Sequence, residues 1–312
     1  MNKKSIYFLH DADVDDLVSL FLLTQMEHVT LSGVSVIPAD GYLTPGTEAS
    51  RKIIDRFSRQ QIEVARSSSR GMNPFPREWR MRSFYINALP ILNESGKMDT
   101  PVSPLPAHKH LIQAVHHADQ PITLLCTGPL SDIARALDEA PDIEEKIEQL
   151  IWMGGTLNPV GNVLEPEHDG SAEWNAFWDP EAVARVWQSR LNIKMVALES
   201  TNQVPLTIPI RNQWARLREY IGLDFIGQCY ASVPPLVHFE TNATYYLWDV
   251  LTTIVAGFPD LVQTKQVRTK VHVEKPSQGK IETAEDGRPV EIVYDVDRDA
   301  FFSSIIDLAE RA

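Results

Sequence analysis

Four aspartates crowd one short stretch near the start of the chain, and they are the residues best suited to chemistry. They fall within six positions: Asp11, Asp13, Asp15 and Asp16. Carboxylates packed this closely repel one another, and burying them unpaired is unfavourable. A hard cation such as Ca²⁺ or Mg²⁺ removes the repulsion, because it binds through carboxylate oxygens. The alternative is a solvated acidic turn with one Asp capping a helix. A cap requires a single Asp, so four of them favour a metal site.

The residues around these acids predict where the acids lie. The apolar run Ile6–Leu9 precedes them and predicts a strand buried on both faces, as in the interior of a parallel sheet. Apolar residues with helical spacing follow from Leu17 to Leu22. The acids therefore lie where a core strand ends and a helix begins. In open α/β sheets, ligands bind at that edge.

The alternation of strand and helix continues along the chain. Further strands are predicted at residues 30–37, 62–65, 122–126, 149–153 and 195–198. Helices are predicted at residues 47–57, 108–118, 133–137 and 180–187. Asp40 follows the strand at 30–37, and Thr127 follows the strand at 122–126. This pattern predicts an α/β fold: one open, doubly wound, mostly parallel, Rossmann-like sheet with helices on both faces and active-site loops at the C-terminal strand ends. We expect residues 1–312 to form a single domain.

Two further regions carry candidate site residues. Residues 67–106 are rich in Ser, Pro and Gly, yet they include several aromatic residues, so we expect a loop that folds over a site. Residues 208–258 are predicted to be mostly helical. Asp249 lies there among aromatic residues, and an acid in such surroundings needs a partner. Alternating residues at 266–274 and 290–296 predict a hairpin, and 299–308 a closing helix.

Composition excludes several classes of protein. The 312 residues are 43% hydrophobic and carry a net charge of −13, which argues against nucleic acid or an anionic membrane as a partner. Of the two cysteines, Cys126 lies in an apolar run and is expected to pack as a small apolar residue. Neither a disulfide framework nor a zinc site is indicated. The apolar run near the N-terminus is too short for a signal peptide, so we expect a cytoplasmic protein.

Several motifs, in their order along the chain, resemble those of the nucleoside hydrolases. They are Asp11-Ala12-Asp13-Val14-Asp15-Asp16, Thr127-Gly128-Pro129-Leu130, Met153-Gly154-Gly155, Gly161-Asn162, Ala172-Glu173-Trp174-Asn175 and Trp248-Asp249. The aspartate motif of the family usually opens with one more Asp, at the position of Leu9 here. The resemblance covers most of the chain. It implies hydrolysis of the N-glycosidic bond of ribonucleosides, which gives free base and ribose.

The resemblance also implies a role for each matched residue. Ca²⁺ would be ligated by Asp11, Asp16, Asp249 and the backbone carbonyl of Thr127, and Asp11 would take the proton from the attacking water. Ribose hydroxyls would be bound by Asp15, Asn162, Glu173 and Asn175. Alternatively, Asn162 is a turn residue and Glu173 a surface charge. Attack by one water from the face opposite the base implies inversion at the anomeric carbon. The partner implied is a small ribonucleoside, and the family resemblance suggests a homodimer.

Further details resemble the purine-specific branch of the family. Trp248 stands where other branches carry a His, and the stretch from Phe75 to Arg80 is similar to the base-stacking loop of that branch. Asp40 matches an acid there, whereas Asp13 replaces an Asn. The resemblance implies that Trp79 and Trp248 sandwich a purine, which favours a protonated, electron-poor ring. Asp13 and Asp40 would contact the edge of the base.

Three other functions remain open from the sequence. A pyrimidine or broad-specificity nucleoside hydrolase keeps the fold and changes the substrate. A nucleoside-binding protein without turnover would bind tightly and release no base. A metal-dependent phosphohydrolase would also use clustered aspartates, but the chain has no Gly-rich phosphate loop and is acidic.

Overall fold

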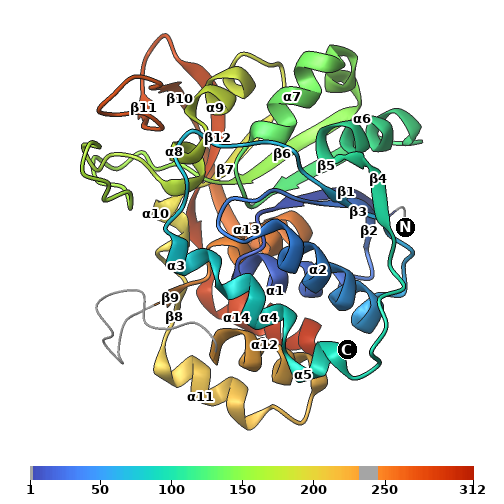
Figure 1. Ribbon diagram of the computed structural model, residues 1–312. Helices are drawn as coiled ribbons and strands as arrows, with labels where there is room; N and C mark the ends of the chain where they lie inside the picture. The colour runs from blue at the N-terminus through green and yellow to red at the C-terminus, as the bar shows by residue number, and fades with distance from the viewer. Residues whose placement is uncertain (1–2, 232–244) are drawn as a thin grey trace.

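One large sheet runs through the molecule (Figure 1). The computed structural model describes residues 3–231 and 245–312. In spatial order the ten strands of this sheet are β11 (Ile281–Thr283), β10 (Val262–Val271), β12 (Arg288–Val296), β7 (Ile193–Val196), β6 (Ile147–Met153), β5 (Ile122–Cys126), β1 (Lys4–His10), β2 (Val29–Val36), β3 (Val64–Arg66) and β4 (Val102–Pro106). Pairing from β12 to β4 is parallel, and β10 pairs antiparallel with β11 and β12. The predicted sheet is confirmed.

The central strand β1 separates two hydrophobic cores. Its side chains alternate: Ile6 and Phe8 belong to one core, and Tyr7 and Leu9 belong to the other. All four are buried, which explains why the strand reads as a continuous apolar run. Cys126 at the end of β5 packs in the second core, as expected.

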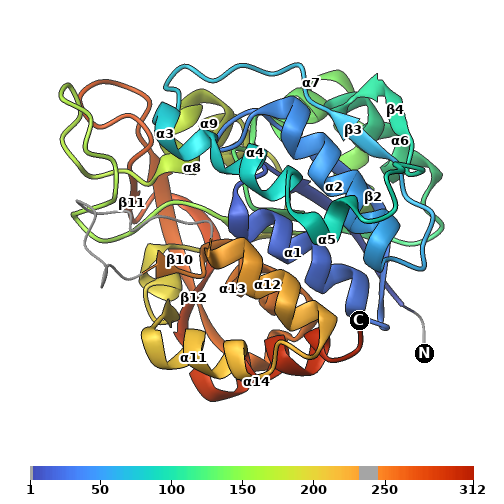
Figure 2. The same ribbon diagram turned by 60° about the horizontal axis from the view of Figure 1, so that its bottom comes forward.

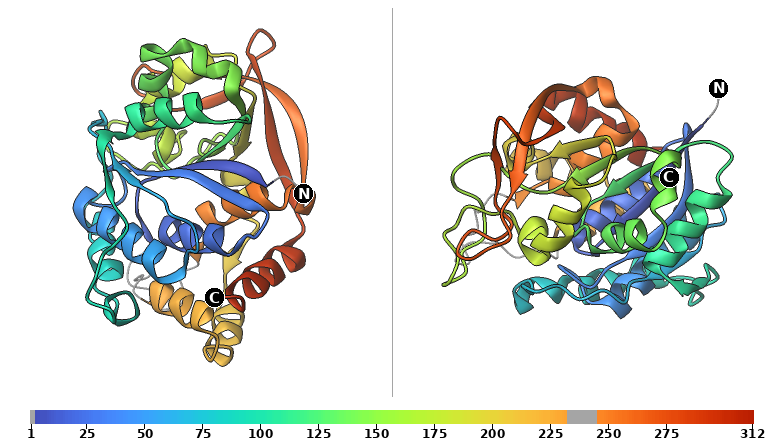
Figure 3. Two further views of the ribbon diagram at one scale, coloured as in Figure 1. Left: turned by 90° about the vertical axis from the view of Figure 1, so that its right-hand side faces the viewer. Right: turned by 90° about the horizontal axis from the view of Figure 1, so that it is seen from above.

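Helices cover both faces of the sheet, as predicted. The first core is covered by α1 (Val14–Gln25), α2 (Leu43–Phe57), α12 (Ile221–Ala231), α13 (Trp248–Gly257) and α14 (Arg298–Ala309). The second core is covered by α6 (Ala107–His117), α7 (Ser131–Glu139) and α9 (Pro180–Trp187). Figure 2 brings the first group forward. In the left view of Figure 3 the green helices lie above the sheet, and the blue, orange and red helices lie below it. No helix in the described ranges is long and apolar enough to cross a bilayer.

The chain reverses its direction across the sheet next to β1. It proceeds outward through β2, β3 and β4, and then returns to β5 on the other side of β1. The connections that leave the carboxyl ends of the neighbouring strands β1 and β5 therefore run in opposite directions, which makes this position a topological switch point. Open α/β sheets bind ligands at this position. Asp11 follows β1 and Thr127 follows β5, so both lie at the switch point.

The segment 67–106 is more ordered than the expected loop. It contains the short helices α3 (Arg77–Arg80), α4 (Arg82–Asn87) and α5 (Pro90–Asn93), and it ends in β4 at one edge of the sheet. The expectation of an irregular segment was wrong in this respect. Because β4 contains Pro104 and Pro106, its sequence does not resemble that of a strand. An edge strand tolerates proline, since its outer backbone groups need no partner.

The C-terminal third agrees with the predictions with small shifts. Residues 208–258 include α11 (Ile208–Arg216), α12 and α13; the expectation for 232–244 lies outside the described residues. A second sheet pairs β8 (Pro205–Leu206) with β9 (Tyr245–Tyr246). The predicted hairpin is formed by β10 and β12, and β11 pairs with the other edge of β10. Short helical segments complete the fold: η1 (Pro141–Lys146), α8 (Trp174–Trp178), α10 (Leu198–Thr201) and η2 (Pro259–Leu261).

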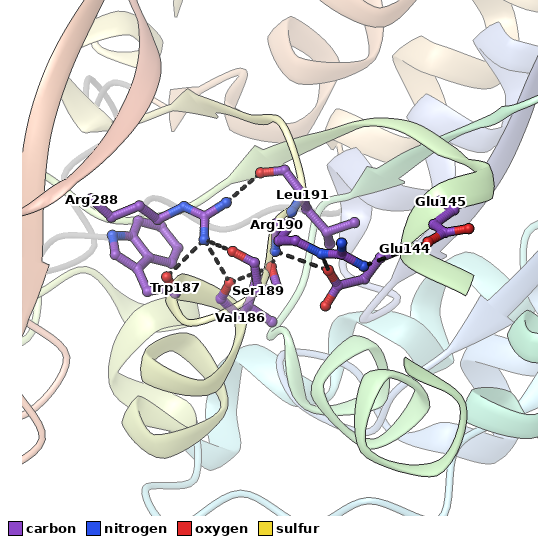
Figure 4. Close-up of polar contacts among 8 residues, drawn as sticks. All are labelled: Glu144, Glu145, Val186, Trp187, Ser189, Arg190, Leu191 and Arg288. Carbon is purple, nitrogen blue, oxygen red and sulfur yellow. Dashed lines mark hydrogen bonds and ion pairs between the residues drawn. The ribbon is translucent and has the colours of Figure 1, made fainter. Parts of the chain in front are cut away.

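An arginine of β12 fastens the end of α9 to the sheet (Figure 4). The guanidinium of Arg288 donates to the carbonyl oxygens of Val186, Trp187, Ser189 and Leu191. The last carbonyls of a helix have no partner within the helix, and a cation there also suits the helix dipole. Arg288 therefore holds the turn between α9 and β7 in place.

Candidate active site

The four N-terminal aspartates are buried rather than solvated. Their exposed fractions are 3%, 3%, 2% and 0%, in the order Asp11, Asp13, Asp15, Asp16. This burial excludes the solvated acidic turn. The loop between β1 and α1 turns at Ala12, whose φ of 67° is the only left-handed value of a non-glycine residue in the described ranges. Strained backbone of this kind is concentrated at functional sites.

Acids from the two ends of the chain meet at the switch point. Asp15, Asp16 and Asp249 each offer one carboxylate oxygen, and these oxygens lie within 4.8 Å of one another. The hydroxyl of Thr127 donates to Asp16 over 2.5 Å, and the backbone N–H of Asp249 donates to Asp15 over 3.2 Å. Asp11 lies beside Asp16, whose charge raises the pKa of Asp11. The predicted ligands therefore come together, and Asp15, predicted to bind ribose, lies among them.

The electrostatics of this cluster call for a cation. Burial raises the pKa of Asp15 to about 7 and that of Asp16 to about 6. Burial, and then the charges of neighbouring acids, raise the pKa of Asp11 and Asp249 well above the usual range. In the described part of the chain no Lys or Arg pairs with any of these four acids. Every candidate ligand atom is an oxygen, so the residues fit a hard divalent cation.

A second group of polar residues lies at the start of α8. Glu173 is the N-cap of this helix, and its carboxylate accepts from the backbone N–H groups of Gly155, Asn175 and Ala176 over 2.8, 2.8 and 3.1 Å. Glu173 is 3% exposed, so it is not a surface charge, and burial raises its pKa to about 7. The amide N–H₂ of Asn175 donates to the carbonyl of Thr127, while its buried Oδ1 has no partner among the residues that the structure describes. That orphaned acceptor is available to a ligand.

Asn162 lies in the exposed loop before α8. Its side-chain oxygen accepts from the backbone N–H of Trp174 over 3.2 Å, and its own carbonyl accepts from the indole N–H of Trp174. Asn162 is thus held against α8 at the rim of the same cavity. From the sequence, Asn162 was either a ribose-binding residue or a turn residue. It lies in a loop and also lines the cavity, so its position is compatible with both.

Aromatic residues form the other end of the cavity. Trp79 packs edge-on against Trp174 with ring centroids 5.4 Å apart, and Phe75 lies 5.1 Å from Trp174. Trp248 packs against Tyr245 at 4.7 Å. The segment 67–106 does fold over the site, because it supplies Phe75 and Trp79 to this cavity.

Two contacts escaped the sequence reasoning. Arg82, at the start of α4, is buried and pairs with Asp13 over 2.7 Å. Tyr245 donates its hydroxyl to Asp15 over 2.9 Å. Arginine in a polar, Pro-rich segment is usually exposed, so nothing in the sequence marked Arg82. The pairing with Asp13 arises only through the tertiary fold.

A single cavity of about 260 Å³ unites these groups. Every residue predicted for the site lines it except Asp16, which joins the cluster through Thr127 and the neighbouring acids. The predicted residues lining it are Asp11, Asp13, Asp15, Asp40, Trp79, Thr127, Asn162, Glu173, Asn175, Trp248 and Asp249. The cavity has an acidic end and an aromatic end. This arrangement suits a ligand with hydroxyls at one end and a flat ring at the other.

Comparison with known sequences points to one family. A family profile described as "Inosine-uridine preferring nucleoside hydrolase" matches residues 6–303. The pyrimidine-specific ribonucleoside hydrolase of Shewanella sp. (strain ANA-3) is 30% identical over 206 residues, which are 63% of this chain and 59% of that protein. Its counterpart from Enterobacter sp. (strain 638) is 28% identical over 206 residues, or 63% and 60% of the two chains. The match thus spans about three fifths of the length of these relatives.

Comparison with solved structures agrees. The crystal structure of the inosine-uridine preferring nucleoside hydrolase from Bacillus anthracis matches with a TM-score of 0.95 and 60% identity, covering 99% of this chain and 100% of the other. The purine-preferring ribonucleoside hydrolase from Gardnerella vaginalis shares the fold, with a TM-score of 0.79 and 23% identity over 99% and 100% of the two chains. With a family match over almost its whole length and the family's motifs gathered around one cavity, the chain belongs to the inosine-uridine preferring nucleoside hydrolases.

Proposed function

We propose that this protein hydrolyses the N-glycosidic bond of ribonucleosides to give free base and ribose. The observation that carries the proposal is the burial of Asp11, Asp15, Asp16 and Asp249 at one end of a cavity whose other end is aromatic. Family membership supports the same reaction. A nucleoside has a matching division into a polyhydroxylated sugar and a flat base.

The acidic end would hold a divalent cation, for which we propose Ca²⁺. Its ligands would be Asp11, Asp16, Asp249 and the backbone carbonyl of Thr127, with Asp15 beside them. When bound, the cation would lower the pKa of the attacking water and help to hold that water in place.

The chain's own residues would carry out the remaining steps. The Asp11 carboxylate takes a proton from the attacking water, whose oxygen forms the new bond to the anomeric carbon. The bond from that carbon to the base nitrogen breaks, and its electron pair leaves with the base, which then acquires a proton. Asp15, Asn162, Glu173 and Asn175 hold the ribose hydroxyls, since carboxylates accept and amides both donate and accept. A single displacement of this kind inverts the anomeric carbon.

The aromatic end would bind the base, and we propose a purine as the preferred one. Trp79 and Trp248 supply aromatic faces for stacking, and both line the cavity. Stacking favours a protonated ring, which makes the base a better leaving group. Asp13 and Asp40 would bind the edge of the base, since both carboxylates line the cavity.

A pyrimidine-cleaving or broad-specificity enzyme is the second candidate. The curated relatives named above are pyrimidine-specific, and the related protein from Bacillus anthracis is named for both inosine and uridine. A small cavity of about 260 Å³ accommodates either class of base. We also propose that the protein forms a homodimer, which sedimentation velocity would test.

A substrate panel tests the proposal. Inosine, adenosine, guanosine, uridine and cytidine are each incubated with the protein, with and without a calcium chelator, and free base and ribose are measured. We expect equal amounts of base and ribose, loss of both with chelator, and faster release from inosine than from uridine. Tight nucleoside binding without release would indicate a binding protein. Phosphate release from nucleotides would indicate a phosphohydrolase.

A further inference from the structure

Arg82 is the one arginine that lines the cavity among the described residues. It begins α4, in the segment that also carries Trp79, and its side chain is only 4% exposed. Arginine is rarely buried unless it is paired, and here the pairing is with Asp13 over 2.7 Å. The guanidinium also lies over the Trp79 ring, 5.9 Å from the ring centroid. Arg82 is therefore fixed between the Trp79 ring and the loop that carries the N-terminal acids.

The pairing with Asp13 leaves part of the guanidinium unused. Among the described residues, the buried Nε of Arg82 has no hydrogen-bond partner, whereas the carboxylates of Asp13 and Asp40 lie within hydrogen-bonding reach of each other. All three residues line the same cavity. Buried polar groups are nearly always hydrogen-bonded in native proteins, so this unpaired donor in the wall of the cavity indicates an acceptor group on the ligand.

We propose that Arg82 determines base specificity by favouring bases that carry a ring carbonyl over bases that carry an amino group at the corresponding position. This inference rests on the proposed nucleoside hydrolysis and deepens it. A guanidinium has five N–H donors and no acceptor. Hypoxanthine, guanine and uracil offer it a carbonyl oxygen, whereas the amino groups of adenine and cytosine would place donor against donor.

The same contact assists departure of the base. As the bond to the anomeric carbon breaks, its electron pair enters the ring of the base and is partly delocalised onto the carbonyl oxygen. A fixed cation near that oxygen stabilises the developing charge, and it does so with little reorganisation because Asp13 and Trp79 already hold it. Bases with a carbonyl should thus gain in turnover as well as in binding.

Paired substrates isolate this effect. Inosine and adenosine differ in the group at position 6 of the purine and in the proton on the adjacent N1, and uridine and cytidine differ in the same way at position 4 and N3 of the pyrimidine. The quantity to measure is the ratio of kcat/KM within each pair, with kcat and KM resolved separately. We expect the wild-type protein to favour inosine over adenosine and uridine over cytidine.

Variants then assign the preference to Arg82. Removing Arg82 alone would leave Asp13 without its partner, so the main test is the double variant Asp13→Asn/Arg82→Gln, in which a neutral pair replaces the ion pair. We expect kcat/KM for inosine to fall by about tenfold to a hundredfold and that for adenosine to fall by a smaller factor, so that the ratio decreases. Asp13→Asn alone removes one contact to the base but keeps the guanidinium, so its ratio should stay above that of the double variant. Arg82→Lys, which keeps the charge but not the planar fork, should lower the ratio by a smaller factor.

A remote ion pair serves as the matched control. Arg56 and Glu94 pair over 3.4 Å at the surface, and Arg56→Gln/Glu94→Gln should leave both ratios as they are. Equal losses for inosine and adenosine in the Arg82 variants, an unchanged ratio, or a wild-type preference for adenosine would overturn the assignment. A wild-type protein that releases base from no nucleoside would instead refute the proposed function, so the two failures are distinguishable.

Discussion

At the scale of single residues, the acids of the site differ in how many ion-pair or hydrogen-bond partners they have. Asp13 is neutralised by Arg82, and Glu173 accepts three backbone N–H groups. Within the described ranges, the Asp11 carboxylate accepts from a single N–H group, the backbone N–H of Asp40 at 3.2 Å, although it is almost fully buried. A buried carboxylate with so little support holds its proton readily. This property suits the residue that is proposed to receive a proton from water.

Asp11→Asn should nearly abolish turnover. The amide keeps the size of the side chain but cannot take the proton, and it is a weaker ligand for a cation. We expect kcat to fall by about a hundredfold to ten-thousandfold in a free-base release assay. Asp119→Asn, which changes an exposed acid, should retain wild-type activity. Turnover by Asp11→Asn within a few-fold of wild type would contradict the role of Asp11.

Trp79→Ala should impair purine turnover more than protein stability. The ring is only partly buried and lies at the aromatic end of the cavity, so its removal takes a stacking surface from the base. Loss of one stacking partner corresponds to about 1–3 kcal/mol. We therefore expect inosine kcat/KM to fall by about tenfold or more, with the thermal midpoint nearly unchanged. Unchanged inosine turnover would show that no stacking occurs on Trp79.

At the scale of elements, the sequence predicted those parts whose signals are local. The buried strands β1, β5 and β6 read as apolar runs, and α9 has the predicted bounds, with the carboxylate of Asp179 accepting from the backbone N–H of Ala182 at its start. The acids at the strand ends were found because topology places such ends together. By contrast, α3 to α5 are too short to show a helical period, so the segment that carries them looked irregular.

Long-range pairing could not be predicted in the same way. Arg82 and Asp13 are 69 positions apart, and nothing in either local sequence specifies the other. The two residues meet because α4 packs against α2 and α1, which depends on the whole first core. The surroundings of Asp13 were therefore the least predictable part of the site, whereas the clustering of the acids at the strand ends was the most predictable.

Arg288→Ala should destabilise the fold without affecting the chemistry. The side chain satisfies several carbonyls beyond α9, and its removal leaves part-buried acceptors unpaired. We expect the free energy of unfolding to fall by roughly 2–4 kcal/mol in urea titrations. Arg190, which is also labelled in Figure 4, pairs with Glu144, but its side chain is 75% exposed.

Arg190→Ala is accordingly the matched comparison, and it should change the free energy of unfolding by less than about 1 kcal/mol. Similar losses for the two variants would show that the carbonyl contacts of Arg288 contribute little. In both variants kcat should match that of the wild type, because neither arginine lines the cavity.

At the scale of the whole molecule, the acid cluster links stability to pH and to cations. Burial raises the pKa of Asp15 to about 7 and that of Asp16 to about 6, whereas an aspartate in the unfolded chain has a pKa near 4. Between about pH 4 and pH 7 the folded protein therefore holds more protons than the unfolded chain. Because the native state binds the excess protons, the free energy of unfolding contributed by these groups falls as pH rises through that window.

Calcium should stabilise the protein more at pH 8 than at pH 5. At pH 8 Asp15 and Asp16 are largely ionised and repel one another unless a cation neutralises them, whereas at pH 5 they are largely protonated. The measurement is the thermal midpoint at both pH values, with calcium and with chelator. Asp16→Asn should reduce the difference between the two pH values. An equal calcium effect at pH 5 and pH 8 would contradict this account of the cluster.

The backbone N–H at Asp249 reaches the Asp15 carboxylate across 234 positions of the chain. During synthesis the N-terminal acids leave the ribosome long before α13 exists. A nascent or truncated polypeptide thus lacks Asp249, and capture of the proposed ion would be one of the last events of maturation. Retention of the ion would then distinguish finished molecules from fragments, and loss of the C-terminal third to a protease would release it.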